Sequence, residues 1–334
     1  MILLTGGTGL VGSHLLVSLT QKGYKVRAIY RNKNNISEAE QIFKFYVDDY
    51  LPLWEKIEWF EADISDYFSI EEALNDVKYV IHAAAKVSFS PGESEKMMQI
   101  NSEGTANIVN ACLDAKIKKF CYVSSISSLG KPIDGEPIHE DLEWQADSNR
   151  SAYSHSKFRA EMEVWRGAKE GLPVVIVNPS VIIGPVNWKR SSGNFFYTAK
   201  KGMPFYTNGS TGFVDVRDVA NSIILLMESD VVDERFLINS ENLPFKELFT
   251  LISTSIGKKA PFIKVSRFLT EIGWRANALL CFITGQTPAI TKDTARTSHS
   301  NAYFSNEKFK KKFNYEFISI EESVNNAAKW FNKK

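Results

Sequence analysis

A glycine-rich turn directly after the first apolar run restricts the fold more than any other segment. The run Ile2–Leu4 leads into Thr5-Gly6-Gly7-Thr8-Gly9-Leu10-Val11-Gly12, and Ser13–Val17 continues with helical spacing. Gly6 permits a tight turn, Gly9 lets the backbone approach a pyrophosphate, and Gly12 lets the helix pack closely. The free N–H groups at the start of that helix attract phosphate. The segment predicts a dinucleotide-binding unit whose cofactor contacts are Gly6, Thr8, Gly9, Leu10, Val11 and Gly12.

Composition and charge narrow the class of protein. The 334 residues are 44% hydrophobic and 24% charged, which is ordinary for a globular chain. Basic and acidic residues number 40 and 39, so the net charge of +1 provides no overall attraction to nucleic acid or to an anionic membrane. The cysteines and histidines show no metal-ligand spacing, so we expect no metal. With no signal peptide and no apolar run long enough to cross a bilayer, we expect a soluble, cytoplasmic protein without an integral membrane segment.

The first half of the chain alternates short apolar runs with helical stretches. The predicted strands are Ile2–Thr5, Lys25–Tyr30, Ile57–Phe60, Tyr79–His82, Phe120–Ser124 and Val174–Asn178. The predicted helices are Leu10–Gln21, Glu95–Ala115 and Ser151–Lys169. The apolar runs lack strict alternation with polar residues, which is typical of strands buried on both faces. This order predicts an α/β Rossmann fold, a doubly wound parallel sheet with helices on both faces and ligands at the carboxyl ends of its strands.

The pattern loosens after Pro179. Two further predicted strands, Phe213–Val216 and Phe236–Asn239, flank a predicted helix over Val219–Glu228. We predict a nucleotide-binding domain over residues 1–182, to which 213–240 returns, and a smaller, interleaved substrate-binding region over 183–334. Most aromatic residues at this density belong to a core, but candidates to line a pocket are Trp188, Phe195, Phe196, Tyr197, Phe205, Tyr206 and Phe213. Phe268–Ile283 is predicted to pack against its own domain, with a hydrophobic lid or a lipid-contacting helix as alternatives.

Tyr153 and Lys157 lie four residues apart on a predicted helix and therefore on one face of it. A phenol has a pKa near 10, so acting near neutral pH requires a fall of roughly three units, or about 4 kcal/mol. A neighbouring ammonium together with an oxidised nicotinamide can supply that by favouring the phenolate. The loop Ser124–Ser128 follows a predicted strand, where a hydroxyl can donate to a substrate carbonyl. Most of these serines are expected to bond their own backbone.

Further segments complete a recognisable set: Asp63-Ile64, His82-Ala83-Ala84-Ala85, Asn101 within Asn-Ser-Glu-Gly-Thr, Ser124-Ser125 and Asn178-Pro179-Ser180. With the glycine turn and the Tyr153/Lys157 pair, they resemble the extended short-chain dehydrogenase/reductase family (the NAD-dependent epimerase/dehydratase superfamily) over essentially the whole chain. The resemblance implies Ser125 as the catalytic serine, with Ser124 as its rival. It implies Tyr153 as general acid/base and Lys157 as an aid to Tyr153 and to the nicotinamide ribose. It also implies cofactor contacts at Asp63, Ile64, Ala83, Ala84, Ala85, Asn101, Val123, Pro179 and Val181.

The end of the second predicted strand bears on the choice of cofactor. A site that selects NAD usually places a carboxylate there for the adenosine ribose. Here the segment Ala28-Ile29-Tyr30-Arg31-Asn32-Lys33 carries two cations and no carboxylate. A guanidinium suits a ribose phosphate, and one charge-assisted hydrogen bond contributes about 1.5–3 kcal/mol, roughly a tenfold to hundredfold preference. We therefore predict NADP(H) rather than NAD(H), with Arg31 at the phosphate; Arg31 stacked on adenine or facing water is the alternative.

Two branches of the family share further segments with this chain. Val26–Arg31 resembles the dihydroflavonol-reductase-like branch, and Ala83–Ser88 with the Ser124–Gly130 loop also resembles the hydroxysteroid dehydrogenase branch. Both imply an NADP(H)-dependent oxidoreductase that interconverts a secondary alcohol and a ketone or aldehyde on a bulky apolar substrate. One alternative is a nucleotide-sugar epimerase or dehydratase with retained NAD(P), its diphosphate held by Lys189, Arg190, Lys200, Lys201 or Arg217. Another is a non-catalytic NADP-sensing protein. A homodimer paired through the helices Glu95–Ala115 and Ser151–Lys169 is compatible with either, and no nucleic-acid partner is expected.

Overall fold

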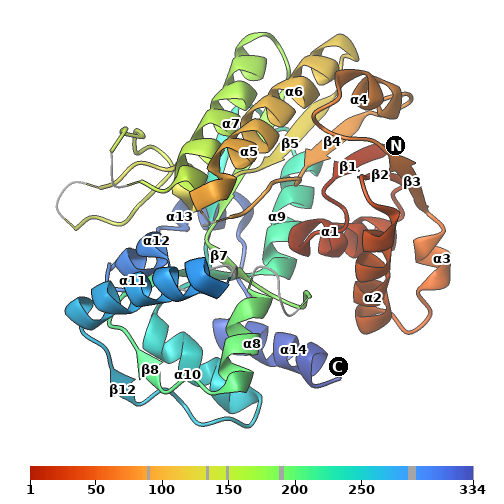
Figure 1. Ribbon diagram of the computed structural model, residues 1–334. Coiled ribbons are helices and arrows are strands. Elements are labelled where there is room, and N and C mark those ends of the chain that lie inside the picture. The colour runs from red at the N-terminus through yellow and green to blue at the C-terminus, as the bar shows by residue number, and fades with distance from the viewer. Residues whose placement is uncertain (89–90, 133–134, 148–149, 188–191, 285–290, 334) are drawn as a thin grey trace.

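The computed structural model describes residues 1–88, 91–132, 135–147, 150–187, 192–284 and 291–333 (Figure 1). Its centre is a seven-stranded parallel sheet of order β10-β6-β5-β4-β1-β2-β3. The strands are β1 (Ile2–Thr5), β2 (Val26–Tyr30), β3 (Ile57–Glu61), β4 (Tyr79–His82), β5 (Lys119–Val123), β6 (Val174–Pro179) and β10 (Glu234–Ile238). The expected Rossmann fold is confirmed, and the strands of the first half lie within one residue of their predicted bounds.

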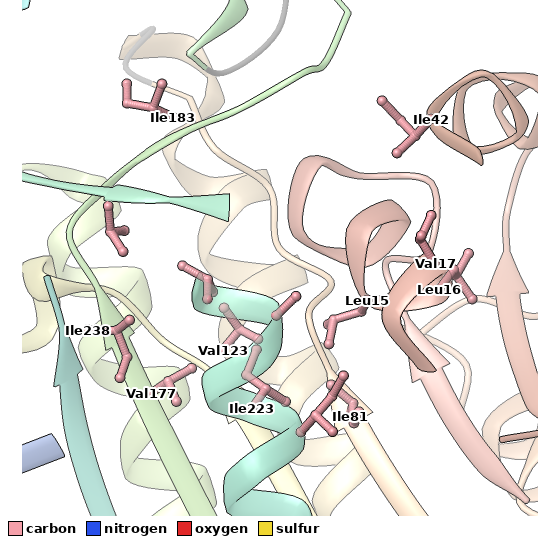
Figure 2. Close-up of a cluster of buried hydrophobic side chains, with 14 of the residues drawn as sticks. Leu15, Leu16, Val17, Ile42, Ile81, Val123, Val177, Ile183, Ile223 and Ile238 are labelled. Atoms are coloured by element: carbon pink, nitrogen blue, oxygen red, sulfur yellow. The ribbon is translucent and has the colours of Figure 1, made fainter. Parts of the chain in front are cut away.

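Helices cover both faces of this sheet, so consecutive residues of a strand enter different cores. Leu4 lies in the core under α1 (Leu10–Gln21), α2 (Ile36–Tyr46) and α9 (Val216–Glu228). Leu3 lies in the core under α4 (Tyr67–Ala73), α6 (Gly104–Asp114) and α7 (Ala152–Lys169). Figure 2 shows part of the first core, where residues such as Ile81 and Val123 meet residues of α1 and α9. Because burying one aliphatic side chain contributes about 1.5–3 kcal/mol, an unbroken apolar run suits a strand between two such cores.

Two predicted helices have different bounds in the structure. The stretch predicted as one helix over Glu95–Ala115 consists of α5 (Ser94–Met98), a π-helical turn (Gln99–Glu103) and α6. The helix predicted from Val219 begins three residues earlier, as α9. It does so because the Asp215 carboxylate caps the helix, accepting a hydrogen bond from the Arg217 N–H at 2.7 Å.

The second half of the chain forms two small sheets and a lobe of helices. The sheets pair β7 (Val181–Ile183) and β11 (Glu241–Pro244) with β9 (Ser210–Asp215), and β8 (Phe205–Tyr206) with β12 (Ile263–Lys264). Figure 1 shows the lobe below the main sheet; its helices are α8 (Gly193–Lys201), α10 (Phe245–Ser255), α11 (Arg267–Thr284), α12 (Lys292–Thr297) and α14 (Ile320–Asn332). Three further helices are α3 (Leu51–Trp54), α5 and, against β10, α13 (Glu307–Phe313).

These pairings bear on the predicted domain division. The predicted strand Phe236–Asn239 is β10, which extends the main sheet beside β6. The predicted strand Phe213–Val216 overlaps β9, which pairs with β7 and β11 outside the main sheet. The boundary at residue 182 and the return of 213–240 to the nucleotide-binding part stay a prediction.

The glycine turn is closed by contacts that leave no room for side chains. Gly6 has φ +74°, and a Cβ on it would lie 2.7 Å from the Ala84 nitrogen at the end of β4. A Cβ on Gly12 would lie 2.0 Å from the Gly6 carbonyl oxygen. The Gly9 N–H donates to that same oxygen at 2.9 Å. The first turn of α1 is therefore packed directly onto the backbone that precedes it.

We predict that Gly12→Ala lowers the free energy of unfolding by about 2–3 kcal/mol, because the added methyl meets a backbone oxygen that cannot move aside. Denaturant unfolding followed by circular dichroism measures it. Gly273→Ala is the matched control, since Gly273 lies in α11 with no atom near its missing Cβ. That variant gains about 0.5–1 kcal/mol from helix propensity. Unchanged stability of Gly12→Ala would contradict the packing described above.

Candidate active site

The amino end of α1 lies at the switch point of the sheet, where β2 and β3 lie to one side of β1 and β4 to the other. The first hydrogen bond within the helix runs from the Ser13 N–H to the Gly9 carbonyl at 2.9 Å, so the amides of Leu10, Val11 and Gly12 precede it. Gly9 stands at the N-cap position and has no side chain that could cap these amides, and the first turn carries no acidic residue. Gly9 is exposed, and a Cβ there would lie 3.2 Å from the Gly6 carbonyl oxygen. The cradle fits the pyrophosphate of a dinucleotide.

Arg31 and Asp63 lie together at the carboxyl ends of β2 and β3. Both side chains are largely exposed, and an Arg31 guanidinium nitrogen lies 3.8 Å from an Asp63 carboxylate oxygen. The other Asp63 oxygen accepts the Ser65 N–H at 2.9 Å. Sequence reasoning considered β2 alone and did not foresee that β3 supplies a carboxylate beside Arg31. Ile64 is buried and packs against Gly104, so its side chain belongs to the core.

A buried relay of hydrogen bonds holds the backbone of residues 83–85 in place. The Ala84 N–H donates to the Thr5 hydroxyl at 3.1 Å, and that hydroxyl lies 2.6 Å from Nδ1 of His82. Nε2 of His82 lies 3.0 Å from the Thr105 hydroxyl, which itself donates to the Asn101 carbonyl. Burial lowers the pKa of His82 to about 3, so the ring is neutral. Because the Thr105 hydroxyl donates its proton to the Asn101 carbonyl, it can only accept a hydrogen bond from His82, so Nε2 of His82 carries the proton. Nδ1 is then unprotonated and accepts a hydrogen bond from the Thr5 hydroxyl. The relay holds the Ala84 backbone against Gly6.

Asn101 ties the segment after β4 to helix α7. Its side-chain oxygen accepts the Lys86 N–H at 2.7 Å. Its amide nitrogen donates to the Lys86 carbonyl at 2.9 Å and to the Ser156 hydroxyl at 3.0 Å. Asn101 sits in the π-helical turn, and its side chain reaches Ser156 on α7. Its expected contact with a cofactor stays a prediction.

Ser125 and Tyr153 meet at the carboxyl end of β5, and Lys157, one helical turn after Tyr153, reaches the same strand end through Tyr122 and Val123. The Tyr153 hydroxyl hydrogen-bonds with Ser125 and Ser127, and the two serine oxygens are 2.7 Å apart. The Lys157 ammonium is buried and donates to the Tyr122 hydroxyl and to the Val123 carbonyl, both at 2.8 Å. It also lies 4.5 Å from the centre of the Tyr122 ring. The structure therefore fixes Lys157 through β5, and sequence reasoning had not identified Tyr122.

The protonation of this group follows from burial. Burial raises the pKa of Tyr153, and the hydrogen bonds from Ser125 and Ser127 oppose that rise. Burial lowers the pKa of Lys157 to about 7, and the nearby Glu161 carboxylate opposes that fall. The expected lowering of the Tyr153 pKa is therefore not produced by the protein groups alone. Sequence reasoning counted the charge of Lys157 but not the cost of burying both side chains.

Glu161 is a fully buried carboxylate beneath the serine loop. One oxygen accepts hydrogen bonds from the Ser124 hydroxyl at 2.6 Å, the Ser128 hydroxyl at 2.7 Å and the Asn178 amide at 2.9 Å. The other oxygen accepts from the Arg235 guanidinium at 2.8 Å. Ser124 thus points toward the interior, whereas Ser125 contacts Tyr153, which favours Ser125 of the two candidates. Sequence reasoning missed Glu161, although it lies four residues after Lys157 on the same helix face.

The remaining predicted residues lie partly in the core. Val123 contributes its carbonyl to Lys157, Pro179 ends β6 and Val181 begins β7. Of the aromatic candidates, Phe213 is fully buried, and Phe196 stacks on Phe331 with ring centres 4.5 Å apart. These two residues belong to the core rather than to a pocket. Trp188, Lys189 and Arg190 lie outside the described residues.

The cations proposed for a diphosphate lie in different settings. Arg217 binds the buried Asp215 carboxylate at 2.8 Å and Glu322 at 3.2 Å, so its charge is already compensated. Lys200 and Lys201 are exposed on α8, and Lys201 lies over the Tyr197 ring. Within the described ranges, no cluster of His, Cys, Asp and Glu side chains is arranged to hold a metal ion. No helix in the described part of the chain is both long and apolar enough to cross a membrane.

Comparison with known proteins gives consistent matches. The model of the NAD dependent epimerase/dehydratase family matches residues 2–238. A Synechocystis sp. protein named "Putative dihydroflavonol 4-reductase" is 28% identical over 98% of this chain and 93% of its own length. Tetraketide alpha-pyrone reductase 2 of Arabidopsis thaliana is 29% identical over 81% of this chain and 92% of its own length. The crystal structure of gox2253 is 30% identical, with a TM-score of 0.81 over 100% of this chain and 98% of that one.

We predict that Glu161→Gln lowers the free energy of unfolding by about 3 kcal/mol, because it leaves the Arg235 guanidinium without its buried counter-charge. Urea unfolding of the variant measures the loss. Glu163→Gln is the matched control on the same helix, since Glu163 pairs with Arg166 in a half-exposed setting. That change costs less than about 1 kcal/mol. Similar losses in the two variants would show that the Glu161 network does not stabilise the fold in the way its geometry indicates.

Proposed function

The chain belongs to the NAD-dependent epimerase/dehydratase family, and from this premise we propose that it is an NADP(H)-dependent oxidoreductase that interconverts a secondary alcohol with a ketone or aldehyde on a bulky apolar substrate. The observation that carries the proposal is the Tyr153 hydroxyl, hydrogen-bonded to Ser125, with the buried Lys157 one helical turn further along α7. Relatives named as reductases support the proposal of an oxidoreductase. A protein that only senses a nucleotide has no need of a buried acid–base group of this kind.

Three side chains have separate roles in the proposed proton transfer. A bound nicotinamide cofactor supplies or accepts the hydride. In the reducing direction Ser125 donates a hydrogen bond to the substrate carbonyl oxygen, and Tyr153 gives its proton to that oxygen as negative charge develops there. The raised pKa of Tyr153 keeps the phenol protonated before this transfer. The positive charge of Lys157 then stabilises the tyrosinate that remains.

The preference for NADP(H) rests on Arg31. Its side chain is 58% exposed, and its nearest carboxylate, Asp63, lies 3.8 Å away. Such exposed pairs contribute about 0–1 kcal/mol, so a ribose phosphate can replace Asp63 as the partner of the guanidinium. Asp63 can instead accept hydrogen bonds from ribose hydroxyls, which is the arrangement that favours NAD. The two cofactors therefore compete at one pair of residues.

We predict that Tyr153→Phe reduces turnover about 10²–10⁴-fold, because it removes the group that donates the proton. The measurement follows NADPH absorbance with parallel panels of apolar ketones, aldehydes and sugar nucleotides. Tyr303→Phe is the control, since it removes the same hydroxyl from a side chain that is 53% exposed.

Carbonyl-dependent loss of NADPH that collapses in Tyr153→Phe and persists in Tyr303→Phe would establish the reductase. Conversion of a sugar nucleotide with no net change in NADPH would instead establish an epimerase or dehydratase. Tight NADPH binding with no turnover on any panel would favour the sensing protein.

We predict that Arg31→Asp reverses the cofactor preference, lowering NADPH affinity at least tenfold to hundredfold relative to NADH, because the phosphate loses its cation and meets a carboxylate. Dissociation constants for both cofactors, measured by fluorescence titration, give the ratio. Lys25→Asp is the matched control, because Lys25 is exposed just before the opposite end of β2. An unchanged NADPH/NADH ratio in Arg31→Asp would rule out Arg31 as the phosphate ligand.

A further inference from the structure

Helix α11 carries several apolar side chains that are exposed to solvent. Phe268 is 72% exposed, Leu280 60%, Leu269 55% and Ile272 51%. At 100° per residue these side chains, together with the exposed Ala276, fall on one arc of the helix. The opposite side of α11 packs on α12, where Cys281 is buried and the Thr270 hydroxyl hydrogen-bonds with His299. The helix is therefore amphipathic, with its apolar side toward solvent.

Further exposed apolar residues lie on and beside the short strands of the same lobe. Phe262 is 70% exposed and Ile263 40%. Ile263 pairs in register with Phe205 of β8, which is 55% exposed. We call the α11 surface the set formed by Phe205, Phe262, Ile263, Phe268, Leu269, Ile272 and Leu280. Exposed apolar residues gathered on one lobe in this way mark an interaction site.

Basic residues predominate in the segment that carries most of the α11 surface. Residues 257–275 include five basic residues and a single acidic one, Glu271, which pairs with Arg275 one helical turn away. The basic residues are all exposed: Lys258, Lys259, Lys264, Arg267 and Arg275. Lys246 adds a further exposed cation over the Tyr206 ring, next to Phe205. Because the whole chain carries a net charge of +1, this excess is local and the rest of the molecule is net negative.

We propose that the α11 surface docks on the face of an anionic phospholipid bilayer. Phenylalanine, leucine and isoleucine side chains enter the boundary between headgroups and acyl chains, while the lysines and arginines of the same segment attract the anionic headgroups. The helix lies in the plane of the interface and does not cross the membrane. Exposed phenylalanines in a segment with more exposed cations than carboxylates are the composition that this mode of binding requires.

The charges disfavour a second copy of the chain as the occupant. A two-fold symmetric contact places each patch against its own duplicate, so five basic residues would face five more across an apolar interface. Like charges in such a contact repel one another. A bilayer supplies the opposite charge instead.

The test is flotation of the full-length protein with vesicles. Vesicles of phosphatidylglycerol mixed with phosphatidylcholine are compared with pure phosphatidylcholine, each at low and high salt. The expected result is binding to the anionic vesicles that weakens as salt rises. Phe268→Glu combined with Ile272→Glu, and separately Lys258→Glu combined with Lys259→Glu, are each expected to weaken it about tenfold or more. Phe68→Glu is the matched control, because Phe68 is 76% exposed on α4, far from this lobe.

Three outcomes overturn the proposal. One is the absence of vesicle binding at low salt. Another is binding that persists unchanged in both double variants, which would place the contact elsewhere. The third is concentration-dependent dimerisation in sedimentation velocity that Phe268→Glu/Ile272→Glu abolishes, with no vesicle binding, which would make the face a subunit interface. None of these readouts depends on catalytic turnover, so they are separate from the test of the reductase.

Discussion

The Glu161 carboxylate lies beneath the candidate active site with no access to water, and four parts of the chain converge on it. Helix α7 carries it, the loop after β5 reaches it through Ser124 and Ser128, β6 through Asn178, and β10 through Arg235. A charge in this position is tolerated only when its lone pairs are all engaged, as they are here. The consequence is that the loop bearing Ser125 and the helix bearing Tyr153 cannot shift independently. The mutual placement of the two candidate catalytic groups thus depends on a residue that touches neither.

The main sheet could be predicted from sequence because its central strands β1, β4, β5 and β6 are buried on both faces and are therefore mostly apolar. The smaller sheets could not be predicted in this way. β8 and β12 are two residues long, and Phe205 and Ile263 are exposed rather than buried. The π-helical turn at Asn101 left no signal in the apolar pattern, since it inserts one residue without ending the helix. Helix α9 began early because of a side-chain cap, which periodicity does not register.

The candidate site was predictable where it depends on motifs and not where it depends on burial. The motifs located Ser125, Tyr153 and Lys157, and the spacing of four placed the last two on one face. The partners of Lys157 come from β5, and the carboxylate beside Arg31 comes from β3, so neither follows from spacing along a single segment. The net charge of +1 likewise gave no indication of the cations gathered in residues 257–275, because a sum over the chain conceals how the charges are distributed.

Burial shifts the pKa values of the two titrating groups of the site in opposite directions. Removing Lys157 from water lowers its pKa to about 7, while removing Tyr153 from water raises its own. Burial therefore disfavours the charged form of each group before a substrate binds. Proton transfer from Tyr153 leaves a tyrosinate one helical turn from Lys157, and the ammonium form of Lys157 stabilises that negative charge. This attraction arises only as the transfer proceeds, which is the condition under which an electrostatic interaction accelerates a reaction rather than merely tightening binding.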